Sequence, residues 1–399
     1  MVTGRPPLTA LIGAYEPGPG AGGLRALLPL AGATLIEHQV RRAVAAGAAR
    51  VLLLIETVPP ELAETLARLR HDGIALSLAE SIGAAADLLA ADEPVLLIAD
   101  ACLPETELIV ALCQAHLPAL AVLPDRLEYQ RYERIDATAR WAGLSLLDGH
   151  RVAETAAMIG GWDPVSTLLR RAVQEGAMRL PADHLPPALM VEPERREDAE
   201  RIMIEAARRP GRDWIERGLF TRMEELLLPP LLARRVEAQP LAFASVGLAG
   251  LSAVLAVADW RAAGFAALLA SGPAAALAAR IARVRDRPVR RAELLARGRI
   301  ALMAMALLAL AGRLVVTTGQ WGWGLVGTAV LAGMAACARE RLLVPGWSPV
   351  WLARPDGLAW LMVPFAFAGR WDAGLVLLAG YAWGCAGAAQ REALLRAAA

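Results

Sequence analysis

From about residue 241, the sequence is a succession of apolar stretches with short connections, and this feature limits the possible folds most. The stretches cover residues 241–258, 262–279, 299–318, 321–337, 357–369 and 373–389. Several approach the ~20 residues that a helix needs to cross about 30 Å of hydrocarbon. The pattern predicts an all-α transmembrane domain of six helices, with Pro273 and Pro364 shortening or interrupting the second and fifth. The alternative is an all-α soluble domain, whose core so many apolar runs would overfill.

Arginines gather in two of the connections between these stretches. Residues 270–299 hold eight arginines against two acids, and residues 338–357 hold Arg339, Arg341 and Arg354. Basic loops of membrane proteins stay in the cytoplasm. We therefore expect a multi-pass protein of the inner (cytoplasmic) membrane, with both termini in the cytoplasm because the number of spans is even.

The first half has a different pattern, in which short β-like runs alternate with segments of helical spacing. The β-like runs cover residues 8–14, 50–56, 74–79, 94–100 and 118–124, and the helical segments cover 34–47, 60–72 and 105–116. Such alternation predicts a parallel sheet covered by helices on both faces. The first half is thus expected to be a soluble, Rossmann-like α/β domain. Its N-terminal apolar run is too short for a signal peptide.

Composition excludes some function classes. The chain is 56% hydrophobic, has a mean hydropathy of +0.42 and contains no lysine among its 41 basic residues. Its net charge of +1 argues against a nucleic-acid partner. The cysteines form no CxxC pair, so we interpret them as small buried hydrophobic residues; they are Cys102, Cys113, Cys337 and Cys385.

Between the two halves, residues 208–236 interleave apolar side chains with arginine and glutamate. This pattern is typical of a helix that lies in the membrane interface, and the alternative is an ordinary amphipathic helix between domains. The predicted organisation is a cytoplasmic domain over residues 1–205, an interfacial helix and linker over 206–238, and a transmembrane domain over 239–399.

A glycine-rich segment follows the first predicted strand, with Gly18, Gly20, Gly22 and Gly23. A loop of this kind between a strand and a helix allows backbone N–H groups to approach phosphates closely. The alternative is a loop that uses glycine only for flexibility. Since the chain has no lysine, phosphate contacts would fall to arginine or to these N–H groups.

The segment GGLRALLPLAGATLIEHQ (22–39) resembles the signature of the sugar-phosphate and polyol-phosphate nucleotidyltransferases. The resemblance implies a nucleotide-binding α/β fold and CTP as a possible ligand. It places Arg25 at the position of the family's phosphate-binding lysine, which makes Arg25 the candidate catalytic residue. Gly20, Gly22 and Gly23 are the candidate nucleotide-binding residues of the loop.

The resemblance extends to VLLIADACLP (95–104), where Asp100 ends a predicted strand. It implies that Asp100 binds Mg²⁺ on the nucleotide phosphates, and the carboxyl end of a strand suits this role. The alternative is that Asp100 caps the following helix. The family requires a second acidic ligand, for which Asp136 and Asp163 are both candidates.

The order of domains resembles that of the fused cytidylyltransferase and CDP-alcohol phosphatidyltransferase proteins, such as inositol-phosphate cytidylyltransferase/di-inositol-phosphate-phosphate synthase. In that family the first domain makes a CDP-polyol, and the membrane domain transfers the phospho-polyol to an alcohol. The stretch QPLAFASVGLAGLSAVLA (239–256) resembles the start of the family's first span. The resemblance also suggests a dimer through the membrane spans, which the small residues of 375–389 would permit.

The membrane family carries its metal-binding aspartates in the motif D-x2-D-G-x2-A-R-x8-G-x3-D-x3-D. When the motif is anchored at Ala279-Arg280, its aspartates fall on Gly272, Ala275, Glu293 and Arg297. When it is anchored at Ala282-Arg283, they fall on Ala275, Ala278, Ala296 and Ile300. Neither register predicts a divalent-metal site there, and Arg280 and Arg283 become candidates for binding phosphate groups of a CDP-alcohol or lipid.

These features favour a membrane protein with a degenerate transfer site. It would be a non-catalytic or partner-dependent subunit in phospholipid or sphingolipid head-group metabolism, as a homodimer or as a heterodimer with an active paralogue. The first alternative is an active nucleotidyltransferase or phosphotransferase that makes a CDP-polyol or a phospho-polyol lipid. The second is a module that binds the bilayer's anionic lipids through its arginines.

Overall fold

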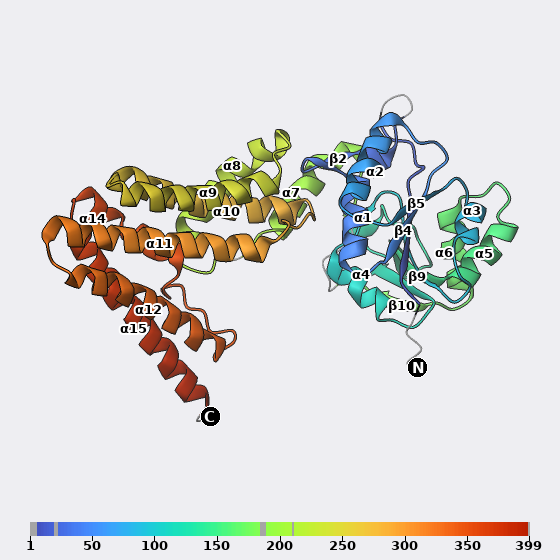
Figure 1. The fold of residues 1–399 in the computed structure, drawn as a ribbon. Helices are drawn as coiled ribbons and strands as arrows, with labels where there is room; N and C mark the ends of the chain where they lie inside the picture. Colours follow the sequence, from blue (N-terminus) through green and yellow to red (C-terminus); the bar gives the residue numbers. More distant parts are fainter. Residues whose placement is uncertain (1–5, 20–22, 184–188, 210, 398–399) are drawn as a thin grey trace. The chain divides into compact units, whose positions relative to one another are not determined.

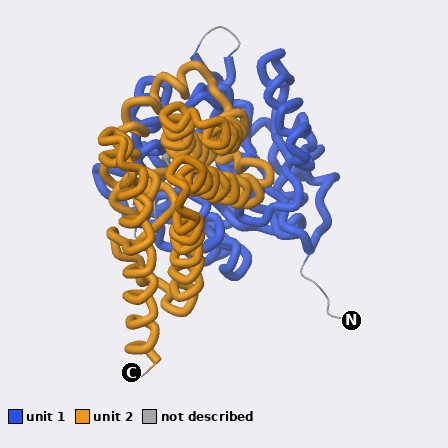
Figure 2. Tube along the Cα trace, turned by 60° about the vertical axis from the view of Figure 1, so that its left-hand side comes forward, with its two compact units in different colours: residues 1–206 blue, residues 207–399 orange. Residues whose placement is uncertain are grey.

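The structure, a computed structural model, describes residues 6–19, 23–183, 189–209 and 211–397. The chain divides into two compact units, Met1–Ala206 (unit 1) and Ala207–Ala399 (unit 2). Figure 2 distinguishes the two units by colour.

Unit 1 is built on a seven-stranded sheet with the order β10-β8-β9-β6-β1-β4-β5. Its strands are β1 (Thr9–Gly13), β4 (Arg50–Leu54), β5 (Leu76–Ala79), β6 (Pro94–Ile98), β8 (Ala119–Pro124), β9 (Ala139–Asp148) and β10 (Met178–Pro181). The predicted β-like runs coincide with β1, β4, β5, β6 and β8. An α/β domain with parallel strands is thereby confirmed.

The strand β9 corrects the prediction of a wholly parallel sheet, because it runs antiparallel to both of its neighbours, β6 and β8. The predicted strands do not include β9, whose apolar run is interrupted by Arg140 and Ser145. Of these two polar residues, only Arg140 has a side-chain partner, while the Ser145 hydroxyl has no hydrogen-bond partner in the described part of the chain. Ser145 is fully buried, and Arg140 Nε donates to Asp125 Oδ1 at 2.6 Å.

Helices cover both faces of the sheet (Figure 1). On one face α1 packs against α4, and on the other α5 packs against both α3 and α6. The helices are α1 (Leu35–Ala45), α2 (Pro60–His71), α3 (Ile82–Asp87), α4 (Thr106–Cys113), α5 (Gly149–Met158), α6 (Pro164–Gln174) and α7 (Arg196–Ala206). The short elements are η1 (Arg25–Leu27), β2 (Pro29–Leu30), β3 (Ala33–Thr34), β7 (Cys102–Leu103), η2 (Leu127–Tyr129), β11 (Leu189–Met190) and η3 (Pro193–Arg195).

Unit 2 is entirely helical in its described part. Its elements are η4 (Glu216–Phe220), α8 (Thr221–Ala233), α9 (Ala238–Val257), α10 (Arg261–Val284), α11 (Ala292–Thr318), α12 (Gly322–Leu342), α13 (Pro355–Leu361), α14 (Val363–Phe367) and α15 (Trp371–Ala397). Five of them, α9, α10, α11, α12 and α15, are long and apolar enough to cross a membrane. Unit 2 therefore has the character of a membrane protein.

The predicted count of six transmembrane helices is not confirmed. The apolar stretch 357–369 contains two short helices, α13 and α14, which meet at Met362 just before Pro364. Proline cannot donate its backbone hydrogen bond and clashes with the preceding turn. Pro273, by contrast, lies inside α10, which continues over 24 residues, so the interruption expected there is wrong.

The segment expected in the membrane interface packs within unit 2. Ile215 and Phe220 are 4% and 3% exposed, and the Phe220 ring meets that of Trp360 edge-on with centroids 6.3 Å apart. Leu226, on the outer side of α8, is 76% exposed. An apolar side chain so exposed is compatible with the interfacial position, which stays a prediction.

Candidate functional site

The loop after β1 and the turn after β6 lie at the carboxyl ends of adjacent parallel strands. β1 pairs in parallel with β4 on one side and with β6 on the other. The chain leaves β1 toward β4 and β5 and then returns to β6 across β1. Open α/β sheets bind ligands in the crevice at such a topological switch point. Residues 14–19 and 23–24 of the glycine-rich segment and Asp100 are therefore placed where a ligand site is expected.

The glycine-rich loop is closed at its base like a hairpin. Pro17 and Leu24 form an antiparallel bridge, and Gly18 N donates to Gly23 O at 2.7 Å. A Cβ atom at Gly18 would lie 2.5 Å from Leu24 C, so only glycine fits there. Gly20 and Gly22, two of the predicted nucleotide-binding residues, lie outside the described residues.

Asp100 is almost fully buried beside this loop, with 3% of its surface exposed. Its Oδ2 accepts a hydrogen bond of 2.7 Å from Glu16 N. Its Oδ1 is buried and has no hydrogen-bond partner in the described part of the chain. The first residue of the next helix is Thr106, and the N-cap of that helix is Glu105. Asp100 therefore does not cap α4 and has an oxygen available to a ligand.

Arg25 begins η1 on the returning side of the loop. Its Nη1 lies 2.6 Å from Glu16 Oε2, and its side chain is 29% exposed. Its buried Nε has no hydrogen-bond partner among the residues that the structure describes. Glu16 thus contacts both predicted residues, Asp100 through its backbone and Arg25 through its carboxylate. Sequence reasoning did not single out Glu16, because its partner lies 84 residues away.

The electrostatics of Asp100 suit a site for a cation. Burial raises the pKa of this carboxyl to about 7. The backbone N–H groups of Glu16 and Tyr15 lower this pKa, the Glu16 charge raises it, and the Arg25 charge lowers it. A cation that approached Oδ1 would favour the ionised form. Mg²⁺ commonly binds through one or two carboxylates together with substrate phosphates, so the donor present here fits Mg²⁺ on a nucleotide.

Gln39 holds the Asp100 turn in place. Its Nε2 lies within hydrogen-bond distance of three backbone carbonyls, those of Ala99 at 3.0 Å, Asp100 at 2.9 Å and Cys102 at 2.6 Å, which share its two hydrogens. Gln39 lies on α1 and is fully buried. Gln39 is the last residue of the segment that resembles the nucleotidyltransferase signature. Its contacts indicate that this residue positions the backbone around Asp100.

The two candidates for a second acidic ligand differ in their surroundings. Asp163 caps α6 by accepting from Ser166 N at 2.7 Å, and it accepts from the Tyr15 hydroxyl at 2.8 Å. Asp136 pairs with Arg179 at 2.6 Å and accepts hydrogen bonds within its own turn. Asp163 is thus connected to the loop after β1 through Tyr15, whereas Asp136 is occupied by structural contacts.

Within the described ranges, no group of three or more histidine, cysteine, aspartate or glutamate residues is placed to hold a metal ion. Any Mg²⁺ bound at Asp100 would therefore complete its coordination with water or with phosphate oxygens of a ligand.

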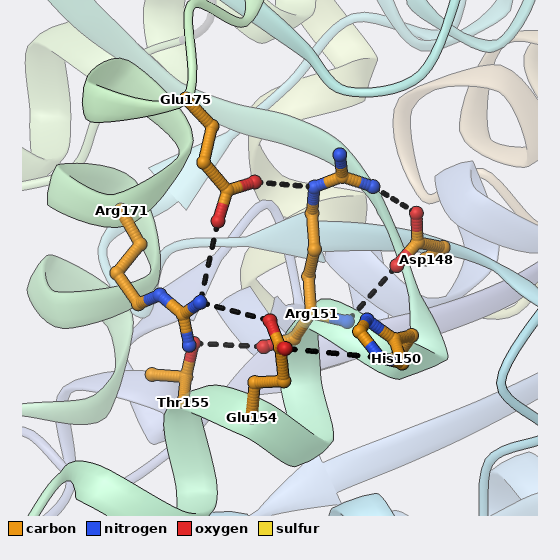
Figure 3. Close-up of polar contacts among 7 residues, drawn as sticks. All are labelled: Asp148, His150, Arg151, Glu154, Thr155, Arg171 and Glu175. Atoms are coloured by element: carbon orange, nitrogen blue, oxygen red, sulfur yellow. Dashed lines mark hydrogen bonds and ion pairs between the residues drawn. The ribbon is translucent and has the colours of Figure 1, made fainter.

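A separate polar network fixes α5 against α6 (Figure 3). Arg151 Nε donates to Glu175 Oε2 at 2.6 Å, and Arg171 Nη2 donates to Glu154 Oε2 at 2.9 Å. Asp148 caps α5 and also pairs with Arg151. Each arginine in this network has an acidic partner, so the network stabilises the position of α6 and hence of Asp163 at its start.

In unit 2, the positions of the transfer motif carry no acidic cluster. A Cβ atom at Gly272 would lie 2.7 Å from Phe220 Cζ and 2.8 Å from Asp356 Oδ1. Glu293, the one acid at a motif position, is 78% exposed and pairs with Arg297. The nearby carboxylate of Asp356 comes from α13, and Arg299 binds both of its oxygens at 2.7 Å.

Several arginines of residues 280–299 bind other parts of unit 2. Arg280 is 5% exposed and lies 4.0 Å from Glu224 of α8. Arg283 Nε donates to Ala207 O at 3.1 Å. Arg285 Nη1 donates to Val236 O at 2.8 Å, just after α8. These contacts attach the start of unit 2 to α10, a structural role that the phosphate-binding hypothesis for Arg280 and Arg283 did not anticipate.

Among known proteins, the chain is similar only at a distance to solved structures. No protein-family model and no curated protein matches the sequence. Among solved structures, the chain is similar to a CMP:2-keto-3-deoxy-manno-octonic acid synthetase in complex with CTP. The match has 14% sequence identity and a TM-score of 0.38, and it covers 50% of this chain and 99% of that one. A match at this level assigns neither a family nor a residue's role.

Proposed function

We propose that the chain is a membrane-associated, cytidylyltransferase-like protein whose unit 1 binds a nucleoside triphosphate with Mg²⁺, with CTP as the first candidate. One observation carries the proposal. Asp100, at the switch point of the sheet, is buried and keeps one carboxylate oxygen without a hydrogen-bond partner among the described residues. A buried polar atom without a partner costs about 1–3 kcal/mol, and a ligand-borne cation would offset that cost.

Each residue of the site would contact a different part of the bound nucleotide and its metal ion. Asp100 would hold the cation, Arg25 would contact the phosphates, and the loop that includes Gly23 would supply backbone N–H groups. When bound, Mg²⁺ would neutralise the phosphate charge. Glu16 restrains the Arg25 guanidinium at 2.6 Å, so phosphate binding would have to compete with this ion pair.

For unit 2 we propose no metal-dependent transfer reaction. The motif positions hold Gly272, Ala275, an exposed Glu293 and Arg297, and the adjacent Asp356 is already bound by Arg299. The protein would then be a non-catalytic or partner-dependent subunit in phospholipid or sphingolipid head-group metabolism. As a homodimer or a heterodimer with an active paralogue, it would sit in the inner membrane with both termini in the cytoplasm.

Calorimetric titration of the purified full-length protein with CTP tests nucleotide binding, in the presence of Mg²⁺ or of EDTA. We expect binding that requires Mg²⁺ and is lost in Asp100→Asn. Asp87→Asn is the matched control, because Asp87 is an exposed acid at the end of α3. Equal binding by the two variants, or binding that ignores Mg²⁺, would contradict the proposal.

The second candidate is an active nucleotidyltransferase. The observation in its favour is that Glu16 contacts both the Arg25 guanidinium and the Asp100 carboxylate. It predicts pyrophosphate release from CTP in the presence of a polyol phosphate or another phosphorylated acceptor. That release would disappear in Asp100→Asn and fall in Arg25→Gln. CTP binding without pyrophosphate release across a panel of acceptors would support the binding subunit over the enzyme.

A further inference from the structure

Unit 2 contains a partly open apolar chamber that the proposed function does not use. It has a volume of about 550 Å³ and is bounded by α9, α10, α11, α12, α13 and α15. Its wall is mainly aliphatic and aromatic, and includes Phe265, Leu268, Met303, Leu307, Leu331 and Met334. The volume lies in the range of small-molecule sites. An apolar chamber within a bundle of long apolar helices suits a hydrocarbon chain.

Two arginines, Arg341 and Arg354, line this chamber where α12 ends and α13 begins. The Nε atom of each is buried and has no hydrogen-bond partner in the described part of the chain. Nη2 of Arg354 donates to Ser348 Oγ at 3.0 Å. Neither guanidinium forms an ion pair with an acid of the described ranges, so both retain donors that a ligand could use.

Charges of both signs surround Arg354, and together with burial they leave its pKa below the ordinary value. Burial lowers the pKa of Arg354, and the neighbouring charge of Arg341 lowers it further. Arg212 acts in the same direction, while Glu216 and Asp213 act against it. Two like charges close together in a partly desolvated place are unfavourable unless an anion compensates them.

The third arginine of the chamber provides an internal comparison. Arg261 begins α10, and its Nε donates to Asp259 Oδ1 at 2.8 Å. The chamber therefore contains one arginine that forms an ion pair and two that form none with an acid of the described ranges. These two adjoin the apolar space near Pro355 and Leu358.

We propose that this chamber binds a lipid that carries a phosphate in its head group, with the phosphate between Arg341 and Arg354 and part of the hydrocarbon chain among the apolar side chains. Guanidinium groups bind phosphate oxygens through paired, charge-assisted hydrogen bonds. The apolar wall distinguishes such a lipid from a free nucleotide or inorganic phosphate. The site lies entirely in unit 2 and does not depend on nucleotide binding in unit 1.

The test uses the delipidated full-length protein in a neutral detergent, with binding followed by native mass spectrometry. The probes are dioleoyl phosphatidic acid, dioleoylglycerol and glycerol 3-phosphate. We expect phosphatidic acid to bind, dioleoylglycerol to bind at least about tenfold more weakly, and glycerol 3-phosphate not to compete. Competition by glycerol 3-phosphate at the same concentration as the lipid would overturn the proposal.

Single substitutions separate the two parts of the site. Arg341→Gln and Arg354→Gln should each weaken phosphatidic acid binding by roughly 10- to 100-fold, the loss for a hydrogen bond to a charged group. The matched control is Arg339→Gln, an exposed arginine on the same helix that does not line the chamber. An equal loss in Arg339→Gln would indicate attraction to the surface and would overturn the proposed site.

A variant that fills the chamber tests the apolar part without altering charge. Ala304 lines the chamber, whereas Ala301 on the same helix is exposed and does not. Ala304→Trp should abolish binding of phosphatidic acid, and Ala301→Trp should preserve it. Unchanged binding in Ala304→Trp would overturn the proposal, even where an arginine variant fails to fold.

Discussion

Arg299 of α11 and Asp356 of α13 form a two-point ion pair, with Nη1–Oδ1 and Nη2–Oδ2 distances of 2.7 Å each. The two side chains are 12% and 15% exposed. Removal of one partner leaves an uncompensated charge in a buried place, which typically costs about 3–5 kcal/mol. We expect Arg299→Gln and Asp356→Asn each to lower the melting temperature of unit 2 strongly.

Thermal unfolding in detergent, followed by intrinsic fluorescence, measures this effect. Arg297→Gln is the control, because Arg297 pairs with Glu293 at the surface, where both side chains are at least 75% exposed. Exposed pairs contribute little, so its melting temperature should stay near that of the unaltered protein. A loss in Arg297→Gln as large as that in Asp356→Asn would refute a special role for the buried pair.

An aspartate in place of Gly272, as in the motif of the membrane family, should lower the stability of unit 2. A Cβ atom there would lie 2.7 Å from Phe220 Cζ and 2.8 Å from Asp356 Oδ1. Overpacking of this kind usually costs about 1–3 kcal/mol, and a carboxylate beside Asp356 adds repulsion. We expect Gly272→Ala to lower the melting temperature and Gly272→Asp to lower it further.

Gly298 is the control for glycine substitution in a helix, since a Cβ atom at Gly298 meets no atom within 4 Å. Gly298→Ala should be neutral or stabilising, because alanine is the better helix former. If Gly272→Asp were as stable as the unaltered protein, the space near Phe220 would have to accommodate the motif acid after all.

Gln39 should be essential for the shape of the Asp100 turn. Its Nε2 serves the carbonyls of Ala99, Asp100 and Cys102. Gln39→Leu leaves these carbonyls without that donor, at about 1–3 kcal/mol for each that stays unsatisfied. We expect a lower melting temperature for unit 1, measured by scanning calorimetry. Gln114→Leu, at an exposed position after α4, should have little effect, and an equal effect would refute the positioning role.

Asp100 should make the stability of unit 1 depend on pH. Burial raises its folded-state pKa from 3.8 to about 7, so between these values the folded protein binds a proton that the unfolded chain has lost. The free energy of unfolding then falls as pH rises from about 4 to 7, by up to about 1.4 kcal/mol per pH unit. Above pH 7 this contribution is constant.

Calorimetry of the ligand-free protein between pH 4.5 and 8 tests the sign. Asp100→Asn cannot titrate and should remove this part of the slope, so its stability relative to the unaltered protein should rise with pH. A difference between the two proteins that stays constant over this range would show that the carboxyl has an ordinary pKa.

The sequence pattern predicts what depends on local periodicity. The strands β1, β4, β5, β6 and β8 are short apolar runs between turn residues, and their burial on both faces makes such runs conspicuous. Asp100 follows one of them, and its metal role is an expectation from the resemblance to the nucleotidyltransferases. β9 could not be predicted from such a pattern, because its Arg140 is stabilised by Asp125, a partner in another segment.

The rest of the site depends on contacts that connect distant parts of the chain. Glu16 binds Asp100 across 84 residues, and Gln39 reaches the same turn across 61. In unit 2, Asp356 approaches Gly272 from another helix. No spacing rule gives such contacts, since they arise only when the elements pack.

The packing of α12 and α15 bears on the number of membrane crossings. Trp383 Nε1 donates to Ala329 O at 3.0 Å, and Arg396 Nη1 donates to Pro345 O at 3.0 Å. Trp383 precedes Arg396 in the chain, and their partners follow in the same order, with Ala329 in α12 and Pro345 just beyond its end. The two helices therefore run in the same direction. The chain must return between them, and α13 and α14 make up that return.

We therefore expect six crossings, of which the fifth is the broken pair α13 and α14, with both ends of unit 2 on one side of the membrane. Single cysteines at Gly319, Gly346 and Gly369, in a background without the native cysteines, would be labelled with a membrane-impermeant maleimide. These glycines lie in the connections after α11, α12 and α14. Gly319→Cys and Gly369→Cys should be labelled from one side of the membrane, and Gly346→Cys from the other. Labelling of Gly369→Cys from the same side as Gly346→Cys would show that α13 and α14 do not cross the membrane.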